Sequence, residues 1–157
     1  MLLLPSSEGA MPADFTIVDG DMIMWLPAFG ACITMGPPMG KTEAGAKKVK
    51  ATGKLVCLVG DEMKWKSMPI GYIAPPYVEP GMGIAKFVML GPDQKTMLTK
   101  VEGKNVVIKG SLFMAKFMVM MMAKMPAPPS PPVPDPMPFH MGGMGKFINS
   151  NMKVKMG

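Results

Sequence analysis

His140 is the only histidine in the chain, and it limits the catalytic chemistry that the sequence supports. A nucleophile of the serine type needs a neighbouring base, and His140 is the one imidazole that could supply it. His140 lies between a proline-rich stretch and Gly142-Gly143, without the strand, sharp turn and helix that hold such a nucleophile in hydrolases. We therefore predict that the protein is not an enzyme, and a small hydrolase that depends on His140 is kept as an alternative.

The carboxylates and glycines do not form the patterns of other common enzyme sites. The carboxylates are few and make no spaced pair of the kind that glycoside hydrolysis requires. No glycine-rich loop opens a helix for a phosphate or a dinucleotide. Asp21 and Asp61 are predicted to make hydrogen bonds within turns.

Methionine makes up 22 of the 157 residues and offers a different chemistry. Thioether sulfur is a soft ligand, so runs such as MVMMMAKM (118–125) and HMGGM (140–144) could hold monovalent copper. Methionine is also an adaptable apolar residue that fills irregular gaps in cores and interfaces. The sequence favours this packing role, and a methionine-rich copper-binding protein is the alternative function.

Lysine supplies the whole basic set, because the chain contains no arginine, and the formal net charge is +6. Arginine provides the planar fork that reads phosphate and guanine, so its absence argues against nucleic acid as a partner. We expect the lysines mainly in contact with solvent and along strand edges, where they keep a β protein soluble. An anionic membrane surface or an acidic protein partner is the alternative.

The two cysteines, Cys32 and Cys57, are too few to form a disulfide framework in a chain of this length. We predict that both are small, buried apolar residues. The longest apolar run, residues 112–125, contains Lys116 and Lys124, so a transmembrane helix is not expected there.

The backbone that must position these side chains is predicted to be all-β. The chain contains 18 glycines and 18 prolines, which interrupt long helices and favour short strands joined by turns. Residues 113–122 alternate as a strand does. One face carries Phe113, Ala115, Phe117, Val119 and Met121, and the other carries Met114, Lys116, Met118, Met120 and Met122.

Strand-like stretches that end in glycine indicate an internal repeat. These glycines are Gly20, Gly60, Gly110 and Gly157, which stand 40, 50 and 47 residues apart. After each of the first three come an acidic or hydroxyl residue, an apolar strand, a proline pair and a Met-Gly dipeptide, always in this order. We predict one domain, 15–157, that consists of three repeats (20–59, 60–109 and 110–157) and follows an N-terminal arm, 1–14.

The same repeat predicts where the chain turns. Gly20, Gly60 and Gly110 are the predicted turn glycines that close each strand. Seven residues before the later glycines stand Gly53, Gly103 and Ser150, each in a polar triplet that we expect to be a hairpin tip.

Three small units of this kind cannot each bury an apolar face alone, so we expect them to pack around a shared axis as a small cone-like domain with pseudo-threefold symmetry and Pro/Gly-rich loops. Such a surface fits the end of a homotrimer, whose open strand edges need to be covered. The predicted docking residues are Met118, Met120, Met122, Trp25 and Trp65. The eight prolines of residues 126–138 predict a stiff strap that crosses one face without sheet hydrogen bonds.

Several segments resemble one protein family. They are GDMIMWL (20–26), GKLVCLVGDE (53–62), PPYVEPGMGIAKF (75–87) and KVEGKNVVIKGS (100–111). These segments resemble the PAAR-like spike-tip proteins of contractile injection systems, over about residues 15–157. The resemblance implies a small β-rich cone that docks on a trimeric VgrG-like spike and sharpens it, so that the spike pierces the target envelope when the sheath contracts.

The resemblance also implies a metal, zinc or iron, near the tip, since PAAR proteins hold zinc with histidines and a cysteine. In this sequence the candidate ligands are Cys32, Cys57 and His140, with a carboxylate or water as the fourth. None of them has the short paired spacing that is typical of structural zinc sites, so the sequence departs here from the family pattern.

The partners and location also follow from the resemblance. It implies one copy of the chain per trimeric spike, a transient contact with the target membrane, and effector or cargo proteins that attach without a covalent link. The protein would be assembled in the producer cytoplasm on the spike and baseplate complex and then ejected toward the target cell. The sequence does not distinguish a type VI secretion system from an extracellular injection particle.

Overall fold

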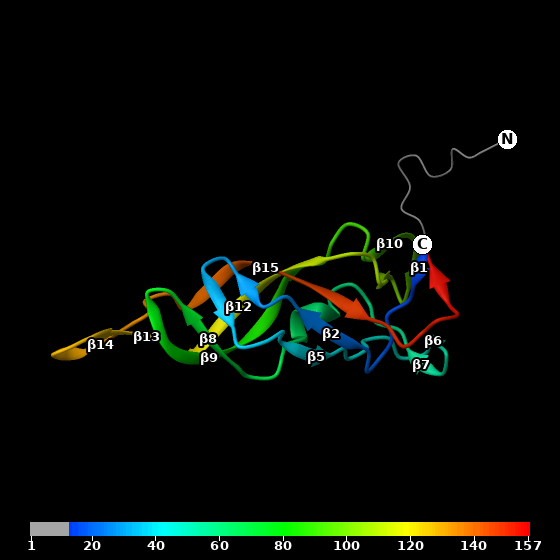
Figure 1. Cartoon of the computed structure of the whole chain (residues 1–157). Helices are drawn as coiled ribbons and strands as arrows, with labels where there is room; N and C mark the ends of the chain where they lie inside the picture. Colours follow the sequence, from blue (N-terminus) through cyan, green and yellow to red (C-terminus); the bar gives the residue numbers. More distant parts are fainter. Residues whose placement is uncertain (1–12) are drawn as a thin grey trace.

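The computed structural model of the chain describes residues 13–157, so all but the last two residues of the predicted arm, 1–14, lie outside the described residues. Regular structure in 13–157 is β-strand apart from one short 3-10 helix, η2 (Asp61–Lys64), as Figure 1 shows. The prediction of an all-β fold is confirmed. The strands are β1 (Asp14–Phe15), β2 (Met22–Trp25), β3 (Ala28–Phe29), β4 (Cys32–Thr34), β5 (Met39–Lys41), β6 (Lys50–Ala51), β7 (Lys54–Leu55), β8 (Ile70–Ala74), β9 (Tyr77–Met89), β10 (Lys95–Val101), β11 (Lys104–Val107), β12 (Phe113–Met121), β13 (Lys124–Ala127), β14 (Ser130–Pro134), β15 (Phe139–Ile148) and β16 (Lys155–Met156).

Ten of these strands form one antiparallel sheet that curls around the core. Eight strands follow the order β3-β4-β8-β9-β12-β15-β2-β5, and the β13–β14 hairpin joins this sheet beside β9. Isolated bridges between Gly40 and Ser67 and between Lys66 and Lys86 connect the outer strand β5 to β9. The sheet is therefore curled into a partly closed barrel.

Aromatic side chains fill the inside of this barrel. The rings of Phe87 and Phe113 stack with their centroids 4.0 Å apart, and Trp25 and Trp65 pack edge-on against Phe87 at 5.7 and 5.6 Å. Gly145 makes room for this packing, because a Cβ atom at that position would lie 2.3 Å from the Phe113 ring. Burial of these large rings supplies the main apolar stabilisation of the barrel.

Strand β12 shows how the sequence pattern places side chains in this sheet. Phe113, Ala115 and Phe117 are at most 1% exposed, whereas Met114 between them is 49% exposed. The predicted alternation of buried and exposed faces is confirmed for this part of the strand.

Three separate two-stranded sheets lie together at one end of the molecule, which we call the hairpin end (Figure 1). They are β6–β7, β10–β11 and β1–β16. The first two are hairpins with tips at Thr52-Gly53 and Glu102-Gly103, as predicted. In each tip both residues have positive φ, 50° and 82° in the first and 53° and 81° in the second, which suits the tight hairpin turn.

The third two-stranded sheet has no turn, because its strands come from opposite ends of the described residues. Asp14 lies opposite Met156 and Phe15 opposite Lys155, in the same register as Lys54 opposite Ala51 and Leu55 opposite Lys50. Two predictions were therefore wrong. Residues 149–151 are not a hairpin tip, because β15 pairs with β2 and β16 with β1. The strand before Gly157 matches the first strand of each hairpin and not the second.

The proline-rich stretch forms the opposite end of the molecule (Figure 1). Strands β13 and β14 pair with each other, with Met125 opposite Val133 and Ala127 opposite Ser130. The predicted strap without sheet hydrogen bonds was therefore wrong. The prolines of β14 are tolerated because it is an edge strand that pairs only with β13, so it needs few of the N–H groups that proline lacks.

None of the helical residues in 13–157 forms a helix that is long and apolar enough to cross a membrane.

Candidate docking surface and the opposite end

Three chain segments, each leading out of one of the two-stranded sheets at the hairpin end, are joined by a closed cycle of backbone hydrogen bonds. Ile17 donates to the carbonyl of Val107, Val107 donates to Cys57, and Cys57 donates to Ile17, at 2.9 to 3.0 Å. These residues stand 40 and 50 positions apart, which are the spacings of the repeat glycines. Each segment thus contacts the other two in the same way.

A second ring of three hydrogen bonds joins the same segments in the opposite direction. Asp19 donates to the carbonyl of Leu55 at 2.8 Å, Val59 donates to Asn105 at 2.8 Å, and Lys109 donates to Phe15 at 2.9 Å. Both rings repeat with the same spacing, so the three segments make equivalent backbone contacts at this level of the molecule.

The repeat glycines lie directly after these rings, where the chain turns away toward the barrel. Gly20, Gly60 and Gly110 have φ values of 82°, 110° and 50°. Left-handed backbone of this kind costs a glycine little, whereas residues with a side chain rarely adopt it. In the first two turns, the carboxylates of Asp21 and Asp61 accept hydrogen bonds from the backbone N–H three residues earlier, at 2.9 and 2.8 Å.

Cys57 lies within the first ring, where it is equivalent to Ile17 and Val107, and all three are fully buried. Burial raises the pKa of the Cys57 thiol well above its usual range, with a further rise from the nearby carboxylates of Asp61 and Asp21. The thiol therefore stays protonated at neutral pH and acts as a small apolar side chain between the segments. The sequence prediction that both cysteines are buried is confirmed.

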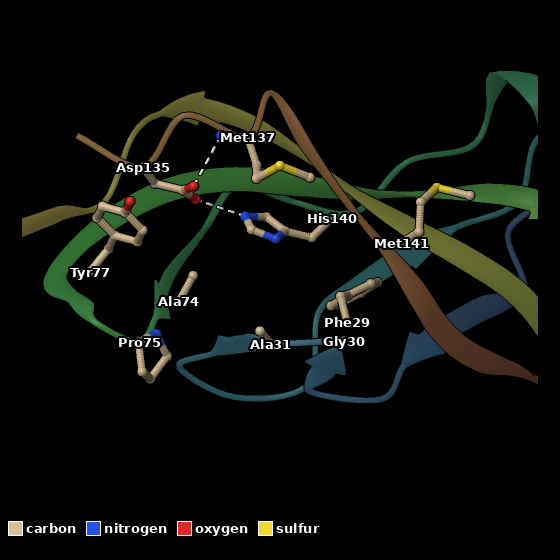
Figure 2. Close-up of a pocket in the computed structure, with 10 residues that line it drawn as sticks. All are labelled: Phe29, Gly30, Ala31, Ala74, Pro75, Tyr77, Asp135, Met137, His140 and Met141. Atoms are coloured by element: carbon tan, nitrogen blue, oxygen red, sulfur yellow. Dashed lines mark hydrogen bonds and ion pairs between the residues drawn. The ribbon is translucent and has the colours of Figure 1, made fainter.

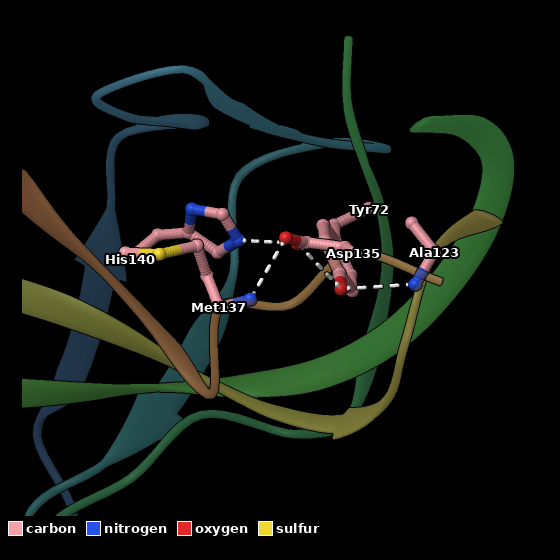
Figure 3. A network of polar contacts seen from close by, with 5 residues as sticks. All are labelled: Tyr72, Ala123, Asp135, Met137 and His140. Carbon is pink, nitrogen blue, oxygen red and sulfur yellow. Dashed lines mark hydrogen bonds and ion pairs between the residues drawn. The ribbon is translucent and has the colours of Figure 1, made fainter. Parts of the chain in front are cut away.

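A network of buried polar side chains holds the proline-rich hairpin to the barrel (Figure 3). Asp135, which is 1% exposed, accepts a hydrogen bond from the Tyr72 hydroxyl at 3.3 Å and lies 2.8 Å from His140 Nε2. The Tyr72 hydroxyl also accepts the N–H of Ala123 at 3.0 Å, and the N–H of Asp135 donates to the Ala123 carbonyl at 2.7 Å. Burial raises the Tyr72 pKa, and the Asp135 charge raises it further, so the hydroxyl remains a donor.

A pocket of about 340 Å³ opens beside this network (Figure 2). Its polar side chains are Tyr77, Asp135 and His140, and its walls are otherwise apolar, from residues such as Phe29 and Met141. The nearby Cys32 has its pKa raised to about 12, first by burial and then by the Asp135 charge. A protonated thiol is a poor nucleophile, so Cys32 is not activated in this environment.

The structure separates several residues that the sequence grouped together. Trp25 and Trp65 are 0% and 2% exposed in the aromatic core, so their assignment to a docking surface was wrong. Their large rings are needed to fill the barrel, and nothing in their spacing distinguishes a core position from a surface position. Met120 and Met122 are 64% and 51% exposed, and Met118 is partly exposed, at the end of β12 that leads to the proline-rich hairpin.

The candidate metal ligands Cys57 and His140 lie in different parts of the structure. Cys57 belongs to the hydrogen-bonded ring at the hairpin end, whereas His140 is paired with Asp135 beside the proline-rich hairpin. In the described part of the chain, no three His, Cys, Asp or Glu side chains are grouped so that they could hold a metal ion. Zinc or iron on Cys32, Cys57 and His140, and copper on the methionines, stay predictions that metal analysis would test.

Comparison with known protein families gives a match. The family described as "Contractile injection system spike tip protein" has a model that matches residues 11–157. A search of curated proteins found no match.

Proposed function

The chain belongs to the family of contractile injection system spike tip proteins, and from this premise we propose that it closes the end of a trimeric VgrG-like spike and leads that spike through the target envelope. One observation carries the proposal. Two rings of hydrogen bonds join equivalent residues of three chain segments, so a single chain offers a near-threefold end. A near-threefold surface is complementary to the end of a homotrimer, because both repeat the same arrangement three times around an axis.

The hairpin end is the base in this proposal. The three two-stranded sheets lie there together, and the matching residues Phe15, Leu55 and Asn105, one from each sheet, are 40 and 50 positions apart. The partly closed barrel has no such repetition, because its strands are drawn unequally from the three repeats. Docking is therefore assigned to the hairpin end and not to Met118, Met120 and Met122.

The proline-rich hairpin, β13–β14, is the leading end. It lies opposite the hairpin end (Figure 1), and no residue from Met125 to Pro134 carries a charge. Six of the nine residues from Pro126 to Pro134 are proline and lack a backbone N–H. A backbone with few N–H donors is less costly to move through hydrocarbon, where unpaired polar groups find no water.

Site-specific cross-linking tests which end docks. Both native cysteines are buried and protonated, so a thiol reagent will label an introduced cysteine selectively. A photo-cross-linker is attached at Lys54→Cys, at the hairpin end, or at Val133→Cys, in the proline-rich hairpin. With the purified trimeric spike protein of the same injection system, the Lys54→Cys variant should cross-link and the Val133→Cys variant should not.

The alternative outcomes are separable. Cross-linking from Val133→Cys alone would show that the proline-rich hairpin docks on the trimer, which is the reverse of the proposed orientation. Failure of the wild-type chain to co-migrate with the trimer on gel filtration would refute the capping function itself.

A further inference from the structure

Three lysines occupy equivalent positions at the hairpin end. Lys50 lies opposite Leu55, Lys100 opposite Asn105, and Lys155 opposite Phe15. Leu55, Asn105 and Phe15 are the three carbonyl acceptors of the second hydrogen-bonded ring. The backbone of each lysine therefore stands at the same place relative to the ring, although Lys155 belongs to a strand from the opposite end of the described residues and its ammonium group lies 4.7 Å from the centre of the Phe15 ring.

These lysines have no acidic partner within the protein. All three are exposed, and the only ion pair within residues 13–157 is that between His140 and Asp135. The acidic residues at the hairpin end are already occupied by backbone groups. Glu102 accepts the N–H of Lys47 at 2.8 Å, and Asp14 accepts the N–H groups of Phe15 and Gly110 at 2.7 and 3.0 Å.

More lysines surround this set and strengthen its charge. Lys54 and Lys104 occupy equivalent positions on the second strands of the two complete hairpins. Lys47, Lys48 and Lys153 are also exposed in the adjoining segments. Positive charge of one sign on one end of a protein attracts an acidic surface and speeds encounter with it.

We propose that Lys50, Lys100 and Lys155 each face one carboxylate on the three chains of the trimeric spike. The inference rests on the proposed capping function and names the chemistry of its partner surface. A homotrimer repeats every side chain three times around its axis, so one exposed Asp or Glu per chain gives three equivalent carboxylates. One lysine from each of the three equivalent segments matches that number and arrangement.

Charge reversal tests the proposal on the full chain. The variant Lys50→Glu/Lys100→Glu/Lys155→Glu is compared with Lys41→Glu/Lys66→Glu/Lys146→Glu, which makes the same charge change at exposed lysines of the barrel. Binding to the purified trimeric spike protein is measured by biolayer interferometry at low and at physiological salt. The hairpin-end variant should bind about a hundredfold more weakly, mainly through slower association, and the barrel variant should bind like the wild type.

Single substitutions give a sharper test of equivalence. Lys50→Glu, Lys100→Glu and Lys155→Glu should each weaken binding by a similar factor, because each removes one of three like contacts. The neutral triple variant with glutamine should lose less than the glutamate variant, and its binding should depend less on salt. Circular dichroism and thermal melting of every variant confirm that the fold is intact.

The outcomes distinguish this inference from the function on which it rests. Wild-type affinity in the folded hairpin-end triple variant would overturn the lysine contacts and leave capping in place. Absence of binding between the wild-type chain and the trimer would overturn both. If that triple variant kept its affinity for the trimer but lost binding to vesicles of phosphatidylglycerol and phosphatidylcholine, the lysines would serve a lipid surface, and the proposal would be wrong.

Discussion

At the scale of single residues, the buried cysteine and tryptophan side chains show how far burial can be predicted from the sequence. Cys57 shows what the sequence can predict, because a cysteine pair too sparse for disulfides is expected to be buried. Trp25 and Trp65 show the limit. A tryptophan after a repeat glycine could face a partner or the core, and only the contacts of Phe87 and Phe113 with these rings decide between them.

Asp135 is the residue on which the attachment of the proline-rich hairpin most depends. Asp135→Ala removes the acceptor that Tyr72 and His140 share and leaves both buried polar groups without that partner. We expect the free energy of unfolding to fall by about 1–3 kcal/mol. Denaturant unfolding followed by fluorescence measures this change.

The exposed carboxylate of Glu79, on β9, provides the matched control for Asp135. Glu79→Ala should change the stability by less than about 0.5 kcal/mol. Equal stability of the Asp135→Ala variant and the wild type would contradict the structural role of the network.

At the scale of elements, two of the three predicted hairpin tips were right, and the third was wrong because the strand partners were not predicted. Thr52-Gly53 and Glu102-Gly103 are local signals, since two residues with positive φ suffice to make the turn. The pairing of β1 with β16 joins Phe15 to Lys155, and no local signal connects residues so far apart. The proline-rich stretch was misassigned because an edge strand needs few of the N–H groups that proline lacks.

The open hairpin between β1 and β16 predicts that the chain can be permuted. Gly157 and Ala13 occupy the places of Thr52 and Gly53 in the complete hairpin, and a Cβ atom on Gly157 would lie 3.4 Å from Ala13 Cα. A direct bond from Gly157 to position 13, with Ala13→Gly to permit positive φ, and new termini between Thr52 and Gly53 should give a folded protein. Its circular dichroism spectrum should match that of the wild type.

A control permutant opens the chain within β12, between Phe117 and Met118, where the strand pairs on both sides. This permutant should not fold. A folded β12 permutant together with an unfolded hairpin permutant would contradict the described pairing.

The proline-rich hairpin predicts a specific behaviour at lipid surfaces. Replacing Pro131, Pro132 and Pro134 by alanine adds three N–H donors to the exposed strand β14. Because hydrocarbon offers no acceptor for such groups, we expect the variant to insert into a lipid monolayer only at lower surface pressure. Alanine at three exposed prolines outside this hairpin, Pro37, Pro69 and Pro80, is the control and should leave the limiting pressure unchanged. Identical limiting pressures for all three proteins would exclude the hairpin as the lipid-penetrating element.

At the scale of the whole molecule, the sequence predicted the all-β class of fold, and the structure shows where the spacing of the repeat glycines recurs. The spacing of 40 and 50 residues reappears in the hydrogen-bonded rings of the hairpin end. Beyond Gly20, Gly60 and Gly110 the three repeats contribute different strands to one curled sheet. Glycine and proline patterns mark turns in all repeats alike, so they could not reveal this divergence.

The two ends of the molecule therefore differ in chemistry as well as in shape. The hairpin end is lysine-rich and carries the equivalent segments, whereas the opposite end is uncharged from Met125 to Pro134 and rich in proline. The proposed function, with a trimer bound at one end and an envelope met at the other, would use this division.

Cryo-electron microscopy of the trimeric spike with the chain bound tests this account most directly. The account predicts one copy per trimer, with β6–β7, β10–β11 and β1–β16 seated on the three chains and the β13–β14 hairpin farthest from them. Three copies per trimer, or a hairpin end that faces solvent, would contradict it.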